Sequence, residues 1–266
     1  ETKIRKNNEN ESGNRGKLVA TLYTTSLSDF GEYILLTNFN IYVDIFCEQF
    51  KLPQPGYGAN MRMATAENIT IINFGMGSPN AAIIMDLQVQ SAESLPVLGQ
   101  MWGISSKTKL GDLILPLAGI RGEGTSNDYY PARGACVAGF HAPAGGVDSH
   151  TGCPSRLFGR ARCTLRTVGY GSMMKFKEYL KDTRAMAVDM ETATLFNAVF
   201  ANHIPTGALL LVSDNPMMPE GVKTAESDRE VTHNFAPEHV TIGIEALKLI
   251  IGERKTVKHL NMIGNP

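Results

Sequence analysis

The chain has 266 residues and a formal net charge of −1, with 43% hydrophobic and 19% charged residues. This length and composition are typical of a globular protein with one large domain or two small ones. The nearly balanced charge excludes a global field that would attract nucleic acid or an anionic membrane, so any anion site is expected to be local. The apolar runs are too short for a transmembrane helix, and we expect no membrane partner.

Residues 1–28 are polar and lack the apolar core of a secretory signal, so we expect a solvated, disordered tail. The four cysteines form no CxxC pair, and no two histidines have the spacing of zinc ligands. We therefore predict buried or unreactive thiols, no metal site and a cytoplasmic protein.

Short apolar strands alternate with helices along the rest of the chain. In chain order, the expected elements are strand 33–37, helix 40–50, strand 69–74, helix 81–88, strand 110–120, helix 175–183, strand 185–188, helix 191–203, strand 207–213 and helix 238–255. Fully apolar strands that alternate with helices are typical of a largely parallel sheet covered on both faces. We predict a single α/β domain over residues 29–260, with a central mixed, largely parallel sheet flanked by helices.

Ligands of such sheets bind beyond the carboxyl ends of the strands. Three strand ends carry polar or glycine-rich sequences, namely TNFN at 37–40, GMGSPN at 75–80 and SDNP at 213–216. In the second of these, Gly75 and Gly77 allow a tight turn and close approach of a ligand. The free backbone N–H groups at the start of the following helix can hold an anion, although an ordinary strand-to-helix turn has the same sequence features.

Candidate chemistry is carried by three carboxylates and one arginine near strand ends. Asp189 and Glu191 stand at a strand-to-helix junction, where they stabilise the helix dipole or accept hydrogen bonds from a polyol. Asp214 directly follows an apolar strand, where it serves a turn or acts as an acid with a raised pKa. Arg121 follows another strand and is either a phosphate-binding residue or a solvated surface residue.

Six segments of the chain follow a recognisable family order: YILLTNFNIYV, INFGMGSPNAAIIMDL, KLGDLILPLAGIRGEGTSNDY, RAMAVDMETATLF, HIPTGALLLVSDNPMMPEGVK and EHVTIGIEALKLI. Together they resemble the nucleoside phosphorylase superfamily, and within it the AMP nucleosidase family. Met-Glu in VDMETA and Ser-Asp after the apolar strand are the most specific pieces. The resemblance implies a central sheet flanked by helices and a homo-oligomer, such as a hexamer.

The resemblance further implies hydrolysis of the small-molecule nucleotide AMP to adenine and ribose 5-phosphate, without a cofactor or metal. Met190 and Glu191 would hold the ribose, and Asp214 would donate a proton towards N7 of the purine so that the base can leave. The other substrate-binding residues that it implies, near the ribose and phosphate, are Gly75, Met76, Gly77, Ser78, Thr37, Asn38, Asn40 and Arg121. It assigns no group to the activation of water.

The sequence leaves three alternatives to AMP hydrolysis open. The same fold supports phosphorolysis or hydrolysis of unphosphorylated purine nucleosides. Turnover is impaired if the stretch VLGQMWGISS at 97–106, which stands where relatives carry the loop LGKCGG, no longer fits the base and sugar. A nucleic-acid-binding module would use a group of arginines in a Gly/Arg block, namely Arg156, Arg160, Arg162 and Arg166.

The segment 131–172 is rich in Gly, Arg, Ala and Pro and lacks apolar periodicity, whereas its flanks are well patterned. With freely chosen codons, a neighbouring reading frame of this segment, of 93–106 and of 16–23 gives peptides of the family type. We therefore interpret 131–172 as a frame-shifted excursion. We predict that it is poorly packed and that the 97–106 loop is distorted.

Overall fold

The structure is a computed structural model, and the residues it describes are 29–56, 61–88, 92–105, 107–129, 156–163, 178, 180, 182, 185–202, 204–217 and 224–253. The tail expected at residues 1–28 lies outside the described residues. So do 131–155 and 164–172, which make up most of the segment interpreted as an excursion.

The described residues include eight strands that form one mixed sheet in the order β2-β3-β1-β4-β7-β6-β5-β8. The strands are β1 Tyr33–Thr37, β2 Met63–Ala66, β3 Ile69–Asn73, β4 Leu95–Gly103, β5 Leu113–Arg121, β6 Arg156–Cys163, β7 Ala187–Asp189 and β8 Thr206–Asp214. β1 runs parallel to β3 and β4, β4 to β8, and β6 to both β5 and β7. The pairs β2–β3, β4–β7 and β5–β8 are antiparallel.

Strand β4 has a special place, because it pairs with β1, β7 and β8. β7 pairs with β6, β6 with β5, and β5 with β8. Because β8 also pairs with β4, the five strands β4, β7, β6, β5 and β8 form a closed ring. The remaining strands β1, β3 and β2 extend from β4 as an open sheet. The carboxyl ends of β1, β4 and β8 therefore meet at one edge, where the open sheet joins the ring.

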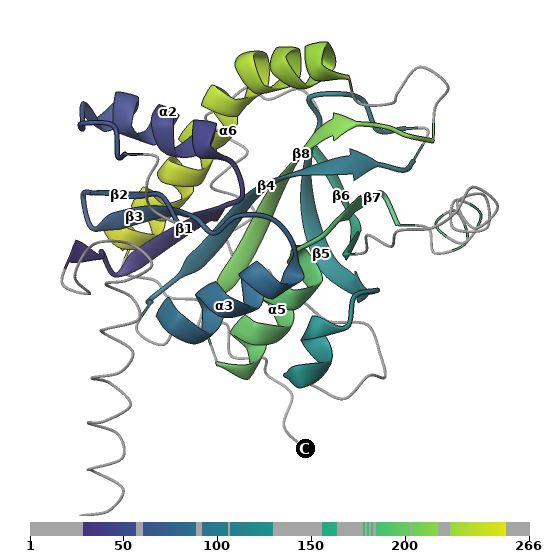
Figure 1. Cartoon of the computed structure of the whole chain (residues 1–266), viewed down its shortest axis with the longest axis horizontal. Coiled ribbons are helices and arrows are strands. Elements are labelled where there is room, and N and C mark those ends of the chain that lie inside the picture. The colour runs from purple at the N-terminus through teal and green to yellow at the C-terminus, as the bar shows by residue number, and fades with distance from the viewer. Residues whose placement is uncertain are drawn as a thin grey trace, which may run out of the picture.

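Helices cover both faces of the sheet, with α2 and α6 on one side and α3 and α5 on the other (Figure 1). Their bounds are α2 Asn40–Phe50, α3 Ser78–Gln88, α5 Thr192–Ala201 and α6 Ala225–Glu253, and a short 3₁₀ helix η3 spans Thr125–Asp128. This arrangement confirms the predicted α/β fold, a mixed and largely parallel sheet flanked by helices. None of the helices in the described part of the chain is long and apolar enough to cross a membrane.

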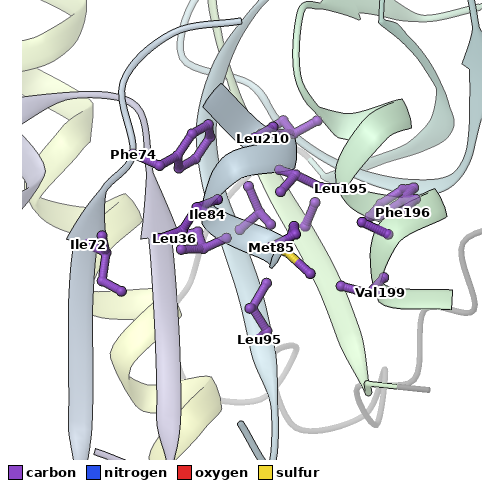
Figure 2. Packing of buried hydrophobic residues seen from close by; sticks show 14 of the residues in the cluster. Leu36, Ile72, Phe74, Ile84, Met85, Leu95, Leu195, Phe196, Val199 and Leu210 are labelled. Atoms are coloured by element: carbon purple, nitrogen blue, oxygen red, sulfur yellow. The ribbon is translucent and has the colours of Figure 1, made fainter. Parts of the chain in front are cut away.

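Each face of the sheet has its own hydrophobic core. Between the sheet and the helices α3 and α5, buried side chains such as Leu36, Ile84, Leu195 and Leu210 pack together (Figure 2). A second cluster joins the other face to α2 and α6, with Phe46 and Val240 among its fully buried members. Since apolar residues of β1 and β8 point alternately to both cores, these strands are apolar throughout, as the sequence suggested.

Several expected boundaries were wrong. Helix α6 begins at Ala225 rather than at residue 238, and its start is capped by reciprocal bonds in which the amides of Thr224 and Ser227 each donate to the other's hydroxyl. The stretch 97–106, taken as a loop, is mostly strand β4, because its backbone pairs with β8 from Leu95 onwards. A register shift between Met101 and Trp102 interrupts this pairing near its end.

The structure describes one part of the segment interpreted as a frame-shifted excursion, residues 156–163. They form strand β6, which pairs in parallel with β5 on one side and with β7 on the other. This part of the Gly/Arg block is therefore hydrogen-bonded within the sheet, and the frame-shift interpretation of 131–172 stays a prediction. Arg156, Arg160 and Arg162 lie in this strand, and Arg166 lies outside the described residues.

Candidate active site

A pocket of about 310 Å³ lies at the edge where the open sheet joins the ring. Its wall draws on the loop after β1, the loop between β3 and α3, the ends of β4 and β8, and the turn after β7. All three strand ends selected from the sequence therefore contribute to one cavity. Four of the residues selected from the sequence line it, namely Asn38, Met76, Met190 and Glu191.

Glu191 is buried, with 4% of its surface exposed, and its carboxylate is fixed by backbone N–H groups. Gly77 donates to Oε1 at 2.6 Å, and Met190 donates to Oε2 at 3.2 Å. The donor from Gly77 reaches the carboxylate from the β3–α3 loop, where Gly77 has a φ of 92° that favours glycine. The carboxylate thus joins two loops across the pocket wall and retains lone pairs for a ligand.

Asp189, the last residue of β7, stands beside Glu191 and also lines the pocket. Its Oδ2 accepts hydrogen bonds from the backbone of Thr192 at 2.8 Å and of Glu191 at 3.3 Å, and from the Thr192 hydroxyl. These amides stand at the start of α5, where a helix leaves donors without an internal partner. Its other oxygen, Oδ1, is buried and has no hydrogen-bond partner among the described residues.

The two carboxyl groups have pKa values above their usual range. Burial raises the pKa of Asp189, and the hydrogen bonds from Thr192 and Glu191 oppose this rise only in part. Burial also raises the pKa of Glu191, and the negative charge of Asp189 raises it further. The pair therefore resists carrying two negative charges and can take up a proton more readily than an exposed carboxylate.

The loop after β1 places its residues differently. Asn38 lines the pocket, and its side chain forms a hydrogen bond with Glu191 that opposes the rise of that pKa. Thr37 is buried, and its hydroxyl accepts a hydrogen bond from the Phe39 backbone at 3.4 Å. Asn40 is exposed and accepts a hydrogen bond from the side chain of Asn73 at 2.7 Å. Only Asn38 of the three predicted residues in this loop is part of the pocket wall.

The loop between β3 and α3 is shaped by two glycines. Gly75 has a φ of 85°, and its N–H donates to the Asn73 side chain at 2.9 Å. Met76, between the two glycines, is 58% exposed and lines the pocket. Ser78 begins α3, and its hydroxyl lies 3.1 Å from the hydroxyl of Thr125 in η3. This contact ties the loop to η3.

Neither Arg121 nor Asp214 lines the pocket. The Arg121 guanidinium donates to Ser126 at 2.8 Å and to Asn127 at 2.6 Å, so it holds η3. Asp214 is buried at the end of β8 and accepts a hydrogen bond of 2.7 Å from Ser213, which does line the pocket. The phosphate-binding role of Arg121 and the acid role of Asp214 stay predictions.

Some lining residues were not selected as site residues from the sequence, namely Phe39, Gln100, Met101, Trp102, Val188 and Ser213. Gln100, Met101 and Trp102 lie in the stretch 97–106, which was expected beside the base and sugar but as a loop rather than as the end of a strand. Asp189 was noted as a carboxylate but was not selected as a site residue. In the described part of the chain, no group of three or more His, Cys, Asp or Glu side chains is placed to hold a metal ion.

Two of the known proteins that the chain is similar to are AMP nucleosidases. The crystal structure of AMP nucleosidase from Bacteroides thetaiotaomicron VPI-5482 is 42% identical, covers 91% of this chain and 97% of its own, and superposes with a TM-score of 0.74. AMP nucleosidase from Escherichia coli (strain K12) is 25% identical over 295 residues, which cover 91% of this chain. The chain spans 60% of the length of that relative.

More distant relatives share the fold. Uridine phosphorylase from Treponema pallidum (strain Nichols) is 23% identical over 242 residues, covering 84% of this chain and 91% of the relative. The crystal structure of purine nucleoside phosphorylase from Toxoplasma gondii is 16% identical, covers 84% of this chain and 95% of its own, and has a TM-score of 0.67. No protein-family profile matches the chain.

Proposed function

The chain belongs to the AMP nucleosidase family, and from this premise we propose that it hydrolyses the N-glycosidic bond of AMP to adenine and ribose 5-phosphate. The observation that carries the proposal is the buried Glu191 carboxylate, fixed at the pocket wall by the backbones of Gly77 and Met190. A carboxylate in a fixed orientation can accept hydrogen bonds from two vicinal hydroxyls, as ribose presents them.

Glu191 is proposed to orient the ribose, with Met190 against the sugar. Both backbone donors are already bound to the carboxylate, so it does not need to reorganise when the sugar arrives. Asn38 and Met76, from the neighbouring loops, complete this side of the pocket. The sugar is thereby held with its anomeric carbon in a defined position.

Asp214 is proposed to act as the acid on the base. Cleavage of a glycosidic bond to a purine passes through a state in which the sugar gains positive charge and the base gains negative charge. A proton donated towards N7 lowers this barrier, and general acids of this kind contribute roughly 10²- to 10⁴-fold. Asp214 is buried at the end of β8, and its Oδ1 accepts a hydrogen bond from Ser213, which lines the pocket.

Arg121, Ser78, Gly75, Thr37 and Asn40 are proposed to act around the phosphate end of the substrate. Ser78 begins α3 and is linked to η3 through Thr125, while Arg121 holds η3 from the other side. A helix start next to an arginine favours a phosphate group. We further propose that the protein acts as a homo-oligomer.

The test is release of adenine from AMP by the purified protein in buffer without inorganic phosphate. Ribose 5-phosphate should appear in equal amount, and added phosphate should not accelerate the reaction. Adenosine and inosine serve as matched substrates that lack the 5′-phosphate. Cleavage of adenosine or inosine alone, or a requirement for inorganic phosphate, would contradict the proposal and favour a nucleoside phosphorylase or nucleosidase activity.

A further inference from the structure

Trp102 is the only tryptophan of the chain, and it stands in the pocket wall with 36% of its surface exposed. Among the described residues, Met76 is the only other large apolar side chain that both lines the pocket and is exposed to this degree. Tryptophan is strongly buried on average in folded proteins. An indole that stays open at a pocket wall therefore offers its surface to a ligand.

The fold leaves the indole without an aromatic or polar partner. Phe39 also lines the pocket, but its ring packs on Tyr42, with the two ring centroids 6.0 Å apart. Within the described part of the chain, no aromatic ring packs on Trp102 and no acceptor binds its indole N–H. The face of such an indole can stack on a planar ligand, which is more favourable than burial of the same area alone.

The backbone of Trp102 is held by strand pairing on both sides. Trp102 is in register with Val188 of β7 and with Asp214 of β8, and the register between β4 and β8 shifts just before it. Irregularities of this kind change the direction of a side chain and are common next to active sites. The indole is therefore carried by the sheet, which fixes it more precisely than a loop would.

The two strands that pair with Trp102 lead to the residues proposed to act on the base and on the sugar. Asp214, proposed to protonate the base, is its register partner on β8. Glu191, proposed to hold the ribose, follows Val188 by three residues, so their Cα atoms are at most about 10 Å apart. Met101 and Val188 make the lining beside the indole apolar. A base joined to a ribose that Glu191 holds is therefore expected in this part of the pocket.

We propose that Trp102 stacks on the base of the substrate and selects a bicyclic purine over a monocyclic pyrimidine, an inference that rests on the proposed function. The face of the indole contacts the face of the base, and the larger ring system of a purine covers more of it. Stacking of a base on an aromatic side chain changes affinity by roughly 5- to 150-fold. The indole forms no covalent bond and transfers no proton.

The first measurement is the tryptophan fluorescence of the purified protein, which reports on Trp102 alone because the chain has one tryptophan. Adenine should quench this fluorescence when it binds, whereas ribose 5-phosphate should bind with little change in it. Cytosine, a monocyclic base, should bind more weakly than adenine.

The decisive variant is Trp102→Leu, which keeps an apolar side chain but loses the ring. Its dissociation constant for adenine, measured by calorimetry, should be roughly 5- to 150-fold higher than that of the wild type. Trp102→Phe is the matched control, because it keeps a smaller aromatic face, and its dissociation constant should rise by no more than about threefold. Affinity for ribose 5-phosphate should stay that of the wild type in both variants, and the preference for adenine over cytosine should shrink in Trp102→Leu.

Four results would overturn the inference. The first is a wild type whose fluorescence adenine does not quench. The second is adenine binding in Trp102→Leu as tight as in the wild type or tighter, which would mean that the indole fills or obstructs the pocket. The third is an equal loss of affinity for adenine and ribose 5-phosphate, which would assign Trp102 to the support of the sheet, and the fourth is an equal loss of adenine affinity in Trp102→Leu and Trp102→Phe. Adenine binding that depends on Trp102, in a protein that releases no adenine from AMP, would instead remove the proposed function and leave a site for the base.

Discussion

Two groups of buried polar side chains are satisfied by hydrogen bonds to different degrees. At the pocket, Asp189 and Glu191 share backbone donors, and one oxygen of Asp189 has no partner among the described residues. Between α2 and α6, the Tyr42 hydroxyl lies 2.8 Å from Nδ1 of His239, and Nε2 of His239 lies 2.8 Å from the Leu209 carbonyl. Both nitrogens of that fully buried histidine are therefore satisfied.

The direction of the hydrogen bonds in the Tyr42–His239 pair follows from the Leu209 carbonyl, to which His239 is bound. A carbonyl oxygen only accepts, so Nε2 of His239 carries the hydrogen and donates to Leu209. Nδ1 is then an acceptor, and Tyr42 donates to it. Burial lowers the pKa of His239 to about 4, which keeps the ring neutral. The pair is a neutral, satisfied unit that stabilises the fold, whereas the pocket carboxylates keep charge and hydrogen-bonding capacity for a ligand at a cost in stability.

The largest expected effect at the pocket is that of Asp214→Asn on the turnover of AMP. If Asp214 protonates the purine, turnover of AMP should fall by roughly 10²- to 10⁴-fold, because an amide cannot deliver that proton. Affinity for AMP and the melting temperature should largely survive, since the amide can still accept the hydrogen bond from Ser213. Single-turnover kinetics with calorimetric binding of AMP measure both. Turnover close to the wild type would remove Asp214 from the acid role.

The pH dependence of stability tests whether the fold keeps His239 neutral. Its pKa in the folded protein, about 4, lies below its ordinary value of 6.5. Between these values the unfolded chain binds a proton that the folded chain does not, so stability falls as the pH is lowered through this window. The loss is about 3 kcal/mol in total. The carboxyl groups of the pocket act in the opposite direction, because their raised pKa values make stability fall as the pH rises.

The measurement is denaturant unfolding of the wild type and of His239→Leu at several pH values from 4 to 7. The difference in free energy of unfolding between the two proteins should shrink as the pH falls. A difference that does not depend on pH would show that His239 is not held neutral by the fold.

Much of the fold was predicted from the sequence, but not all of it. The strands β1 and β8 and the helix α2 were predicted because each is an apolar or amphipathic run with a clear end. β6 was missed because RLFGRARC has no alternation, and its place is set by pairing with β5 and β7. The first half of α6 was missed because it is polar and contains Pro237.

The candidate site was predicted at the level of strand ends rather than of atoms. Glu191 was selected because a carboxylate at a strand-to-helix junction is chemically distinctive, and the structure places it in the pocket wall. The unpartnered oxygen of Asp189 depends on where three donors of α5 lie, which no spacing in the sequence reveals. His239 was unremarkable in the sequence, because its burial depends on contacts with Tyr42 and Leu209.

Glu191→Gln tests the ligand side of the comparison with a smaller effect. The variant loses the charge and places an NH₂ group against the backbone donors of Gly77 or Met190. Affinity for ribose 5-phosphate should fall by roughly 10- to 100-fold, as expected for a hydrogen bond to a charged group. Affinity for free adenine should not change, and calorimetry with both ligands distinguishes the two. Equal losses for adenine and ribose 5-phosphate would mean that Glu191 only supports the start of α5.

Tyr42→Phe has the smallest expected effect and tests whether the satisfied pair acts on stability alone. Removal of the hydroxyl leaves Nδ1 of His239 as a buried acceptor without its donor, which should lower the free energy of unfolding by about 1–2 kcal/mol. The rate of adenine release should stay that of the wild type, because neither Tyr42 nor His239 lines the pocket.

The double variant with His239→Leu supplies the control, since the lost donor no longer matters once its acceptor is gone. In that background Tyr42→Phe should cost much less than in the wild type, because residues in one hydrogen bond are energetically coupled. Equal costs in both backgrounds would show that the pair contributes packing rather than a hydrogen bond. A loss of turnover without a loss of stability would place Tyr42 with the pocket and erase the distinction between the two regions.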